Sequence, residues 1–187
     1  LVLIDVGLGA GQAPEGALEA LYADAAQAGL VSDGLIAQSE AQRQAFWTVR
    51  EAIPAANRRI GAVSSHDISV PLGAVPEFIG QGAPALARIG DFRINCFGHL
   101  GDGNIHFNFS QPEGADREAF MAQWGPATDA IDDLVMELGG SISAEHGIGF
   151  MKRHLMEHIK QPVELELMRS IKATLDPKGI LNPGKVV

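Results

Sequence analysis

Two histidines, His99 and His106, stand on either side of a glycine-rich turn. The pair Asp102-Gly103 favours a two-residue hairpin turn, and a turn at this place predicts that His99 lies directly opposite His106. Opposed side chains on one face of an antiparallel strand pair lie about 5 Å apart, so the two imidazoles could bind one metal ion. The same pattern also fits two solvent-exposed histidines on a sheet face, and both interpretations stay open.

A second reactive pair is Glu145-His146, which lies in the small-residue segment 141–149. Small residues allow the backbone to approach a ligand closely. The adjacent side chains offer one anionic metal ligand and one base that exchanges a proton near neutral pH. Two polar surface residues in front of a helix would give the same sequence.

Other candidate residues are weaker. Arg50 precedes Glu51 toward the end of a segment with the pattern of an amphipathic helix. Arginine is the residue type that grips a carboxylate with two hydrogen bonds, although most neighbouring Arg-Glu pairs on helices are merely solvated. Asn108 shares the polar face of the hairpin with the two histidines. Cys96 falls on the apolar face, which favours burial over nucleophilic chemistry. His154 and His158 stand one helical turn apart among charged neighbours, which indicates a solvated surface.

The composition excludes several classes of function. The chain has 187 residues, and 14 Lys+Arg against 23 Asp+Glu give a net charge of −9. Such a surface repels a phosphate backbone, so we expect no nucleic-acid partner. The aliphatic opening 1–4 is far shorter than the roughly 20 residues of a membrane span. A single cysteine excludes an internal disulfide framework and fits a reducing compartment.

The elements that would position these residues alternate between strands and helices. The hairpin carries apolar side chains on one face and polar ones on the other, which is typical of a half-buried antiparallel sheet. We therefore expect an α+β fold with a mainly antiparallel sheet. Strands are expected over 1–6 (with a glycine-rich turn after it), 34–38, 63–71 and the hairpin 92–109. Helices are expected from Pro14, over 39–56, over 75–89 with a break or kink at Gly80, Gly82 and Pro84, over 116–138, and in two shorter C-terminal segments.

Five motifs together resemble the C-terminal domain of FAD-linked oxidases, in the group of D-lactate and D-2-hydroxyglutarate dehydrogenases. They follow the order of that family along the chain and are highly specific in combination. The motifs are Phe46-Trp-Thr-Val-Arg50-Glu51, His66-Asp67-Ile-Ser-Val-Pro71, His99-Leu-Gly-Asp-Gly-Asn-Ile-His106, Ser143-Ala-Glu145-His146-Gly-Ile-Gly149 and Asp176-Pro-Lys-Gly-Ile-Leu-Asn182-Pro-Gly-Lys185.

The resemblance implies a role for each candidate residue. His99, His106 and Glu145 match the divalent-metal ligands of the family, with zinc as the favoured ion and manganese or iron as alternatives. His146 matches the base that removes the proton of the α-hydroxyl group.

The same resemblance implies which residues contact the substrate and which residue approaches the flavin. Arg50 matches a residue that grips the substrate carboxylate, Asn108 matches a substrate contact, and Asn182 matches a residue that approaches the flavin.

The resemblance further implies a ferredoxin-like cap domain with a C-terminal helical segment. On this interpretation, residues 1–187 are a single domain, a fragment that lacks the N-terminal flavin-binding domain of the same polypeptide. FAD would be bound mainly by that absent domain, the substrate would be a small 2-hydroxy acid, and an electron acceptor would reoxidise the flavin. We expect a cytoplasmic location, with peripheral membrane association through the electron acceptor as an alternative. A homodimer is an optional assembly.

Two departures from the family pattern bear on the substrate. Ser65 stands where the family commonly has Lys, and Pro54 replaces a hydroxyl residue of the hydroxyglutarate-type members. Both changes favour a smaller acid such as D-lactate. Two other functions stay open, a stand-alone metal-dependent hydrolase and a non-catalytic ligand-binding module with a vestigial site.

Overall fold

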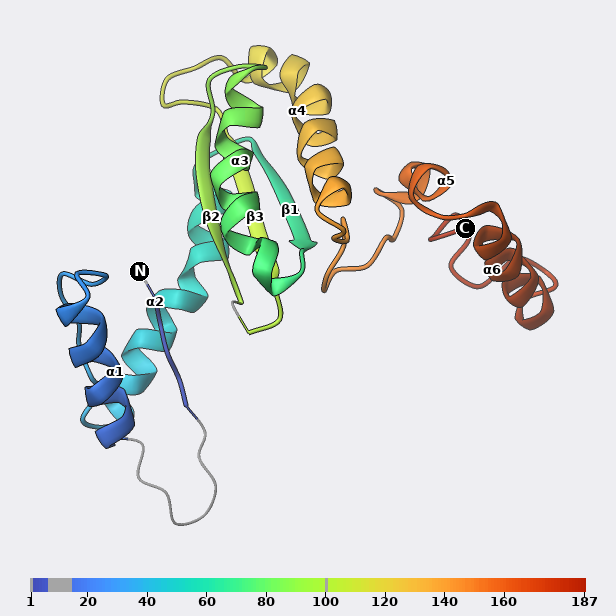
Figure 1. Cartoon of the computed structure of the whole chain (residues 1–187). Helices are drawn as coiled ribbons and strands as arrows, with labels where there is room; N and C mark the ends of the chain where they lie inside the picture. The colour runs from blue at the N-terminus through green and yellow to red at the C-terminus, as the bar shows by residue number, and fades with distance from the viewer. Residues whose placement is uncertain (1, 7–14, 100) are drawn as a thin grey trace. The chain divides into compact units, whose positions relative to one another are not determined.

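The computed structural model describes residues 2–6, 15–99 and 101–187 (Figure 1). The chain divides into two compact units, Leu1–Arg59 and Ile60–Val187. The first unit contains the helices α1 (Glu15–Gln27) and α2 (Glu40–Arg59). The second unit contains the sheet and the remaining helices.

Side-chain hydrogen bonds cap α2 and hold the N-terminal segment against it. The Ser39 hydroxyl caps α2 by accepting a hydrogen bond from the backbone N–H of Gln42 at 3.3 Å. The carboxylate of Asp5 ties the N-terminal segment to α2, because it accepts hydrogen bonds from Arg43 at 2.6 Å and from the Trp47 indole at 2.8 Å. The strands expected over 1–6 and 34–38 do not form among the described residues of these segments, because a strand needs a partner to satisfy its backbone groups and the described part of this unit offers none. The predicted glycine-rich turn 7–11 lies outside the described residues.

The second unit is built on a three-stranded antiparallel sheet with the order β1-β3-β2, formed by β1 (Val63–Ser69), β2 (Arg93–His99) and β3 (Asn104–Ser110). The chain order β1-α3-β2-β3-α4, with α3 (Val75–Ala87) and α4 (Arg117–Glu137), is that of a split βαβ unit. An isolated antiparallel bridge between Ser69 and Ser141 stands on the outer side of β1, where a ferredoxin-like fold has its fourth strand. The expected α+β class with an antiparallel sheet is confirmed.

Short helices complete the unit. A 3-10 turn, Leu72–Ala74, precedes α3, and a second one, Arg153–Leu155, leads into α5 (Met156–Ile159) and α6 (Pro162–Leu175). The C-terminal helices therefore form as expected.

The helix α3 is continuous from Val75 to Ala87, so of the break or kink expected at its glycines and proline, the break is wrong. A proline inside a helix costs roughly 3 kcal/mol. Burial on the inner side of α3 offsets this cost, since Phe78 and Leu86 are almost fully buried. Gly82 is required there, because a Cβ at this position would overlap the ring of Phe107.

The two faces of the sheet differ in chemistry, as the alternation along the strands predicts. One face packs against α3 and α4 and forms the core. We call the opposite one the site face. Its side chains come from alternate positions of the three strands, and they include Ser65, Asp67, Asn95, His99, His106 and Asn108.

The register of the hairpin differs from the expected one. His99 pairs with Asn104, and His106 pairs with Phe97, so the connection is the four-residue segment 100–103 rather than the pair Asp102-Gly103. The Asp102 carboxylate accepts a hydrogen bond from the backbone N–H of Asn104 at 3.0 Å, which closes this longer turn. The shift is an even number of residues, and therefore it leaves both histidines on the same face.

Candidate functional site

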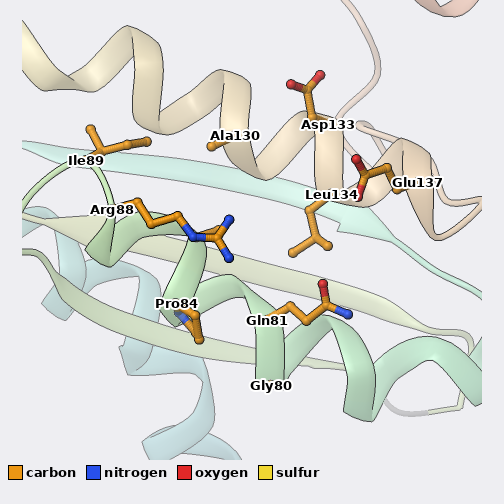
Figure 2. A pocket seen from close by; sticks show the side chains of 10 residues that line it. Gly80, Gln81, Pro84, Arg88, Ile89, Ala130, Asp133, Leu134 and Glu137 are labelled. Carbon is orange, nitrogen blue, oxygen red and sulfur yellow. The ribbon is translucent and has the colours of Figure 1, made fainter.

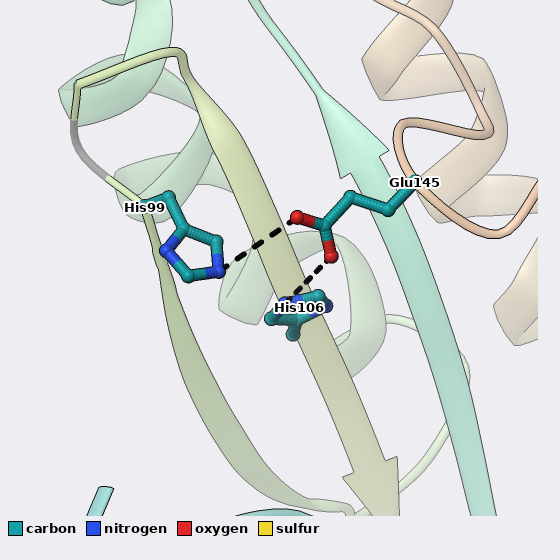
Figure 3. Close-up of side chains that lie close together, drawn as sticks. All are labelled: His99, His106 and Glu145. Carbon is teal, nitrogen blue, oxygen red and sulfur yellow. Dashed lines mark ion pairs between the residues drawn. The ribbon is translucent and has the colours of Figure 1, made fainter. Parts of the chain in front are cut away.

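Three side chains converge at the end of the site face near the hairpin turn (Figure 3). The Nε2 atoms of His99 and His106 each lie 3.9 Å from an oxygen of the Glu145 carboxylate. One nitrogen or oxygen atom from each of the three residues lies within 4.8 Å of the others. The ring centroids of the two histidines are 5.8 Å apart, so diagonal placement on neighbouring strands is close enough for a shared ligand.

The loop after α4 brings Glu145 and His146 to the sheet. Backbone hydrogen bonds join Ser69 and Ser141 in both directions, at 2.9 and 2.8 Å. The N–H of Ala144 donates to the carbonyl oxygen of Asp67 at 3.2 Å. The loop thus follows the outer edge of β1 for a few residues and then turns over the site face.

Gly103 secures the turn on the other side of the site. Its φ of 76° is in the left-handed region, and its carbonyl oxygen accepts a hydrogen bond from the Val70 N–H at 3.1 Å. A Cβ at this position would overlap the carbonyl oxygen of Val70. A glycine is therefore needed for the hairpin to lie against the end of β1.

Asp67 is the buried centre of the cluster. Its Oδ2 accepts hydrogen bonds from the backbone N–H groups of Glu145 at 2.8 Å and of His146 at 2.7 Å. Its Oδ1 accepts a hydrogen bond from the Asn104 side-chain amide at 2.8 Å. The carboxylate also lies 3.6 Å from Nδ1 of His106 and 3.8 Å from Nδ1 of His146.

The electrostatic state of the cluster follows from these contacts. Burial alone would raise the pKa of the Asp67 carboxyl, but the hydrogen bonds from the His146 backbone, the Asn104 amide and the Glu145 backbone outweigh it and hold the pKa below its ordinary value. Burial lowers the pKa of His106, although the carboxylates of Asp67 and Glu145 act in the opposite direction. At neutral pH the site therefore combines an ionised Asp67 with a neutral His106, the state in which imidazole binds metals.

Two overlapping groups could in principle hold a cation, His99 with His106 and Glu145, or Asp67 with Glu145 and His146. A carboxylate has about four lone-pair sites. Asp67 uses three of them for hydrogen bonds, whereas the Glu145 side chain is half exposed at 51%. The first group is therefore the better candidate, and it is the set expected from the sequence.

The other predicted site residues occupy different places. Asn108 is buried on the site face, paired across the strands with Ser65 and Asn95. Arg50 lies on α2 in the first unit, and its role stays a prediction. Asn182 lies in the turn after α6 with a φ of 46°, outside the cluster.

Sequence reasoning missed Asp67 and Asn104 as site residues, although both lie within the motifs that carried the resemblance. A signal was present for Asp67, because it alternates with the buried Ile68 on a strand next to the histidine hairpin. Alternation along the hairpin puts Asn104 on the face of His106 and Asn108, but its contact with Asp67 depends on the pairing of β1 with β3.

A groove of about 420 Å³ lies between α3 and α4, on the helix side of the sheet (Figure 2). Arg88 and Gln81 line it from α3 and the residues after it, and Asp133 and Glu137 line it from α4. It shares no residue with the cluster, so it is separate from the candidate site.

The chain is similar to known proteins over most of its length. Residues 6–186 match the family described as FAD linked oxidases, C-terminal domain. The chain is 39% identical over 168 residues to a D-2-hydroxyglutarate dehydrogenase of Stutzerimonas stutzeri, covering 89% of this chain and 36% of that protein. It is 40% identical over 176 residues to the mitochondrial D-2-hydroxyglutarate dehydrogenase of Arabidopsis thaliana, covering 91% of this chain and 29% of that protein.

A third relative is the mitochondrial D-2-hydroxyglutarate dehydrogenase of Bos taurus, 39% identical over 162 residues, with 85% of this chain and 28% of that protein covered. The chain thus spans about a third of the length of the relatives it matches. None of the helices within residues 15–99 and 101–187 contains an apolar stretch of the length that a membrane span needs.

Proposed function

Because the chain belongs to the family of the C-terminal domain of FAD linked oxidases, we propose that it is the substrate- and metal-binding part of an FAD-dependent D-2-hydroxyacid dehydrogenase. The observation that carries the proposal is the convergence of His99, His106 and Glu145 beside His146. The names of the relatives favour D-2-hydroxyglutarate as the substrate, against the D-lactate-like acid that Ser65 and Pro54 suggest.

The residues present fit a divalent metal ion. Two imidazole nitrogens and one carboxylate oxygen form a donor set that suits zinc, manganese or iron(II) and leaves coordination positions for a substrate. His99 and Glu145 are partly exposed, so an ion held by them can be reached from solvent. The metal would polarise the hydroxyl and carboxylate groups of the bound acid.

We propose that His146 acts as the base. Its side chain is 67% exposed, and the nearby Asp67 carboxylate would stabilise the imidazolium that forms when the ring takes the α-hydroxyl proton. The α-carbon then loses a hydride and the acid becomes a 2-oxo acid. FAD supplies the redox chemistry that takes up this hydride, and we propose that the remainder of the same polypeptide binds it.

The substrate contacts follow the same logic. The Asn108 side chain is buried on the site face, and its Oδ1 has no hydrogen-bond partner among the described residues. A buried oxygen without a partner is costly, so a donor from a bound substrate would be favourable there. We propose that Arg50 grips the carboxylate and that Asn182 approaches the flavin.

The partners and the location of the whole protein stay proposals. We propose an electron acceptor that reoxidises the flavin, and a homodimer as an optional assembly. The plant and bovine relatives are named as mitochondrial proteins, which does not favour a cytoplasmic location for the eukaryotic members.

The test uses full-length protein with an artificial electron acceptor. We expect turnover of D-2-hydroxyglutarate and about one equivalent of metal, measured by mass spectrometry. His146→Ala should lower kcat by roughly 10²- to 10⁴-fold while flavin and metal are retained. His158→Ala is the matched control, because this histidine lies on α5 outside the cluster.

Unchanged turnover in His146→Ala would remove the base assignment. Hydrolytic activity of the chain without any flavin would instead favour the metal-dependent hydrolase.

A further inference from the structure

We propose that Asp67 is a positioning residue: its carboxylate sets where Glu145 and His146 stand relative to the histidines of the hairpin. The side chain of Asp67 is 3% exposed, so substrate is not its direct partner. Its role is to hold other groups, and each of its contacts leads to a residue of the candidate site. The part of this inference that concerns metal affinity rests on the proposed function.

Beyond the bridge at Ser141, hydrogen bonds to Asp67 hold the loop in place of further strand pairing with β1. After the bridge at Ser141 the loop leaves β1, and three N–H groups then point back to Asp67. One reaches the backbone carbonyl oxygen and two consecutive ones, from Glu145 and His146, reach a single carboxylate oxygen. Consecutive N–H groups that converge on one anion form a compact anion-binding turn. The path of the loop over the site face is thereby fixed by one side chain.

A carboxylate is required for this arrangement, and an amide cannot replace it. One oxygen of Asp67 accepts two backbone hydrogen bonds, and the other oxygen accepts one from the Asn104 amide. In Asp67→Asn, the new NH₂ group would face either the two backbone N–H groups or the Asn104 amide. Either two donors would then face each other, or the Asn104 amide would turn round and lose its hydrogen bond to the carbonyl oxygen of Ile68. In each case at least one buried hydrogen bond would be lost.

Asp67 also lies beside the imidazole of a proposed ligand. Its Oδ1 is 3.6 Å from Nδ1 of His106, while Nε2 of the same ring is directed to Glu145. A carboxylate behind a metal-binding histidine orients the ring and raises the basicity of the ligating nitrogen. Loss of such a partner typically lowers metal affinity by about 10- to 100-fold.

The chain contains a matched control for these hydrogen bonds. Asp176 is a buried aspartate whose carboxylate accepts hydrogen bonds from two consecutive backbone N–H groups, those of Ile180 at 3.0 Å and Leu181 at 2.9 Å. Its remaining partner is the cation of Lys172, at 2.6 Å, rather than a histidine of the site. Asp176→Asn therefore disturbs comparable hydrogen bonds that involve none of the proposed ligands.

The first experiment measures hydrogen exchange of the backbone amides in the metal-free chain, so its result does not depend on a metal. In Asp67→Asn we expect the amides of Glu145 and His146 to exchange at least about tenfold faster, since their hydrogen bonds to a charged acceptor are either lost or replaced by weaker bonds to a neutral amide oxygen. In Asp176→Asn the faster amides should be those of Ile180 and Leu181. Exchange at wild-type rates for Glu145 and His146 in Asp67→Asn would overturn the proposal.

The second experiment measures the Kd for Zn²⁺ by competition with a chelator, together with the visible spectrum of the Co²⁺-loaded chain. We expect Asp67→Asn to raise the Kd about 10- to 100-fold and to change the spectrum, which reports ligand geometry. Asp176→Asn should change neither. A Kd within twofold of wild type in Asp67→Asn would overturn the part of the proposal that concerns the ligands.

The two experiments separate two kinds of failure. If the wild-type chain binds no metal, the proposed metal site fails, while the exchange rates still decide whether Asp67 positions the loop. If Asp67→Asn does not fold, Asp67→Glu replaces it, because it keeps the charge and displaces the carboxylate by one methylene. Wild-type exchange of both amides in that variant would overturn the proposal in the same way.

Discussion

The two faces of the three-stranded sheet carry out different tasks with the same strands. On the core face Ile68, Phe107 and Phe109 are almost completely buried against the helices. On the site face their sequence neighbours Asp67, His106 and Asn108 bring together charges, imidazoles and an amide. Because side chains alternate along a strand, each stabilising residue lies next to a residue of the candidate site. A substitution at one position can therefore change the stability of the fold, while a substitution at the next position changes the candidate site.

The adjacent pair His106 and Phe107 gives the largest expected contrast. Phe107→Ala should lower the free energy of unfolding by about 3–5 kcal/mol, because the ring is 1% exposed and packs against Phe78. His106→Ala should abolish metal binding, while the unfolding free energy of the metal-free chain changes by about 1 kcal/mol. Urea unfolding and metal analysis of both variants measure this. Equal losses of stability in the two variants would break the comparison between the faces.

A second test concerns the one histidine of the core face. His66 stacks on Phe109 with ring centroids 5.3 Å apart, and burial together with the nearby Lys152 lowers its pKa to about 4. The unfolded chain therefore binds this proton more readily than the folded chain. His66 contributes stability that is fully present above about pH 6.5 and is lost as the pH falls to about 4, in total about 3 kcal/mol.

Asp132, on α4, acts with the opposite sign. Burial raises the pKa of its carboxyl group from the ordinary 3.8 to about 6. The folded state therefore gains stability as the pH falls from about 6 to about 3.8. We expect the two effects to cancel largely in the wild-type chain between pH 6.5 and 4. Asp132→Asn should expose the full acid-induced loss, and His66→Leu should remove it. Parallel pH profiles of unfolding for the two variants would contradict this assignment.

The smallest expected effect concerns substrate choice on the site face. Ser65 is exposed and pairs directly with Asn108, so a longer side chain at this position would extend along the site face. Ser65→Lys should lower the KM for D-2-hydroxyglutarate a few-fold relative to D-lactate, because it adds a cation that is partly screened by solvent. Ser65→Met is the control for side-chain length. An equal change for both acids would show that the distal carboxylate is not contacted here.

Much of the site face could be predicted because it depends on local rules. Alternation along the hairpin placed His99, His106 and Asn108 on one face without any knowledge of the fold. The register could not be predicted, because the Asp102 side chain bonds to Asn104 and Gly103 lies against Val70, and these contacts select a longer turn than the Asp-Gly pair alone favours.

The role of Asp67 also depended on information that the sequence does not show. Its partners Glu145 and His146 are 78 and 79 residues away along the chain. The failure of the strands expected over 1–6 and 34–38 has the same origin. An apolar run becomes a strand only where another strand is available to pair with it.

The distance in sequence between the proposed ligands has a consequence for how the candidate site is assembled during folding. The two histidines belong to one hairpin, and hairpins form within about 1–10 µs. Glu145 reaches the site only when the chain brings it to Asp67, which lies 78 residues away in the sequence. Contacts between residues so far apart in the sequence form slowly. We therefore expect the two histidines to come together first. The carboxylate of the proposed donor set is expected to join after the sheet, α3 and α4 have packed.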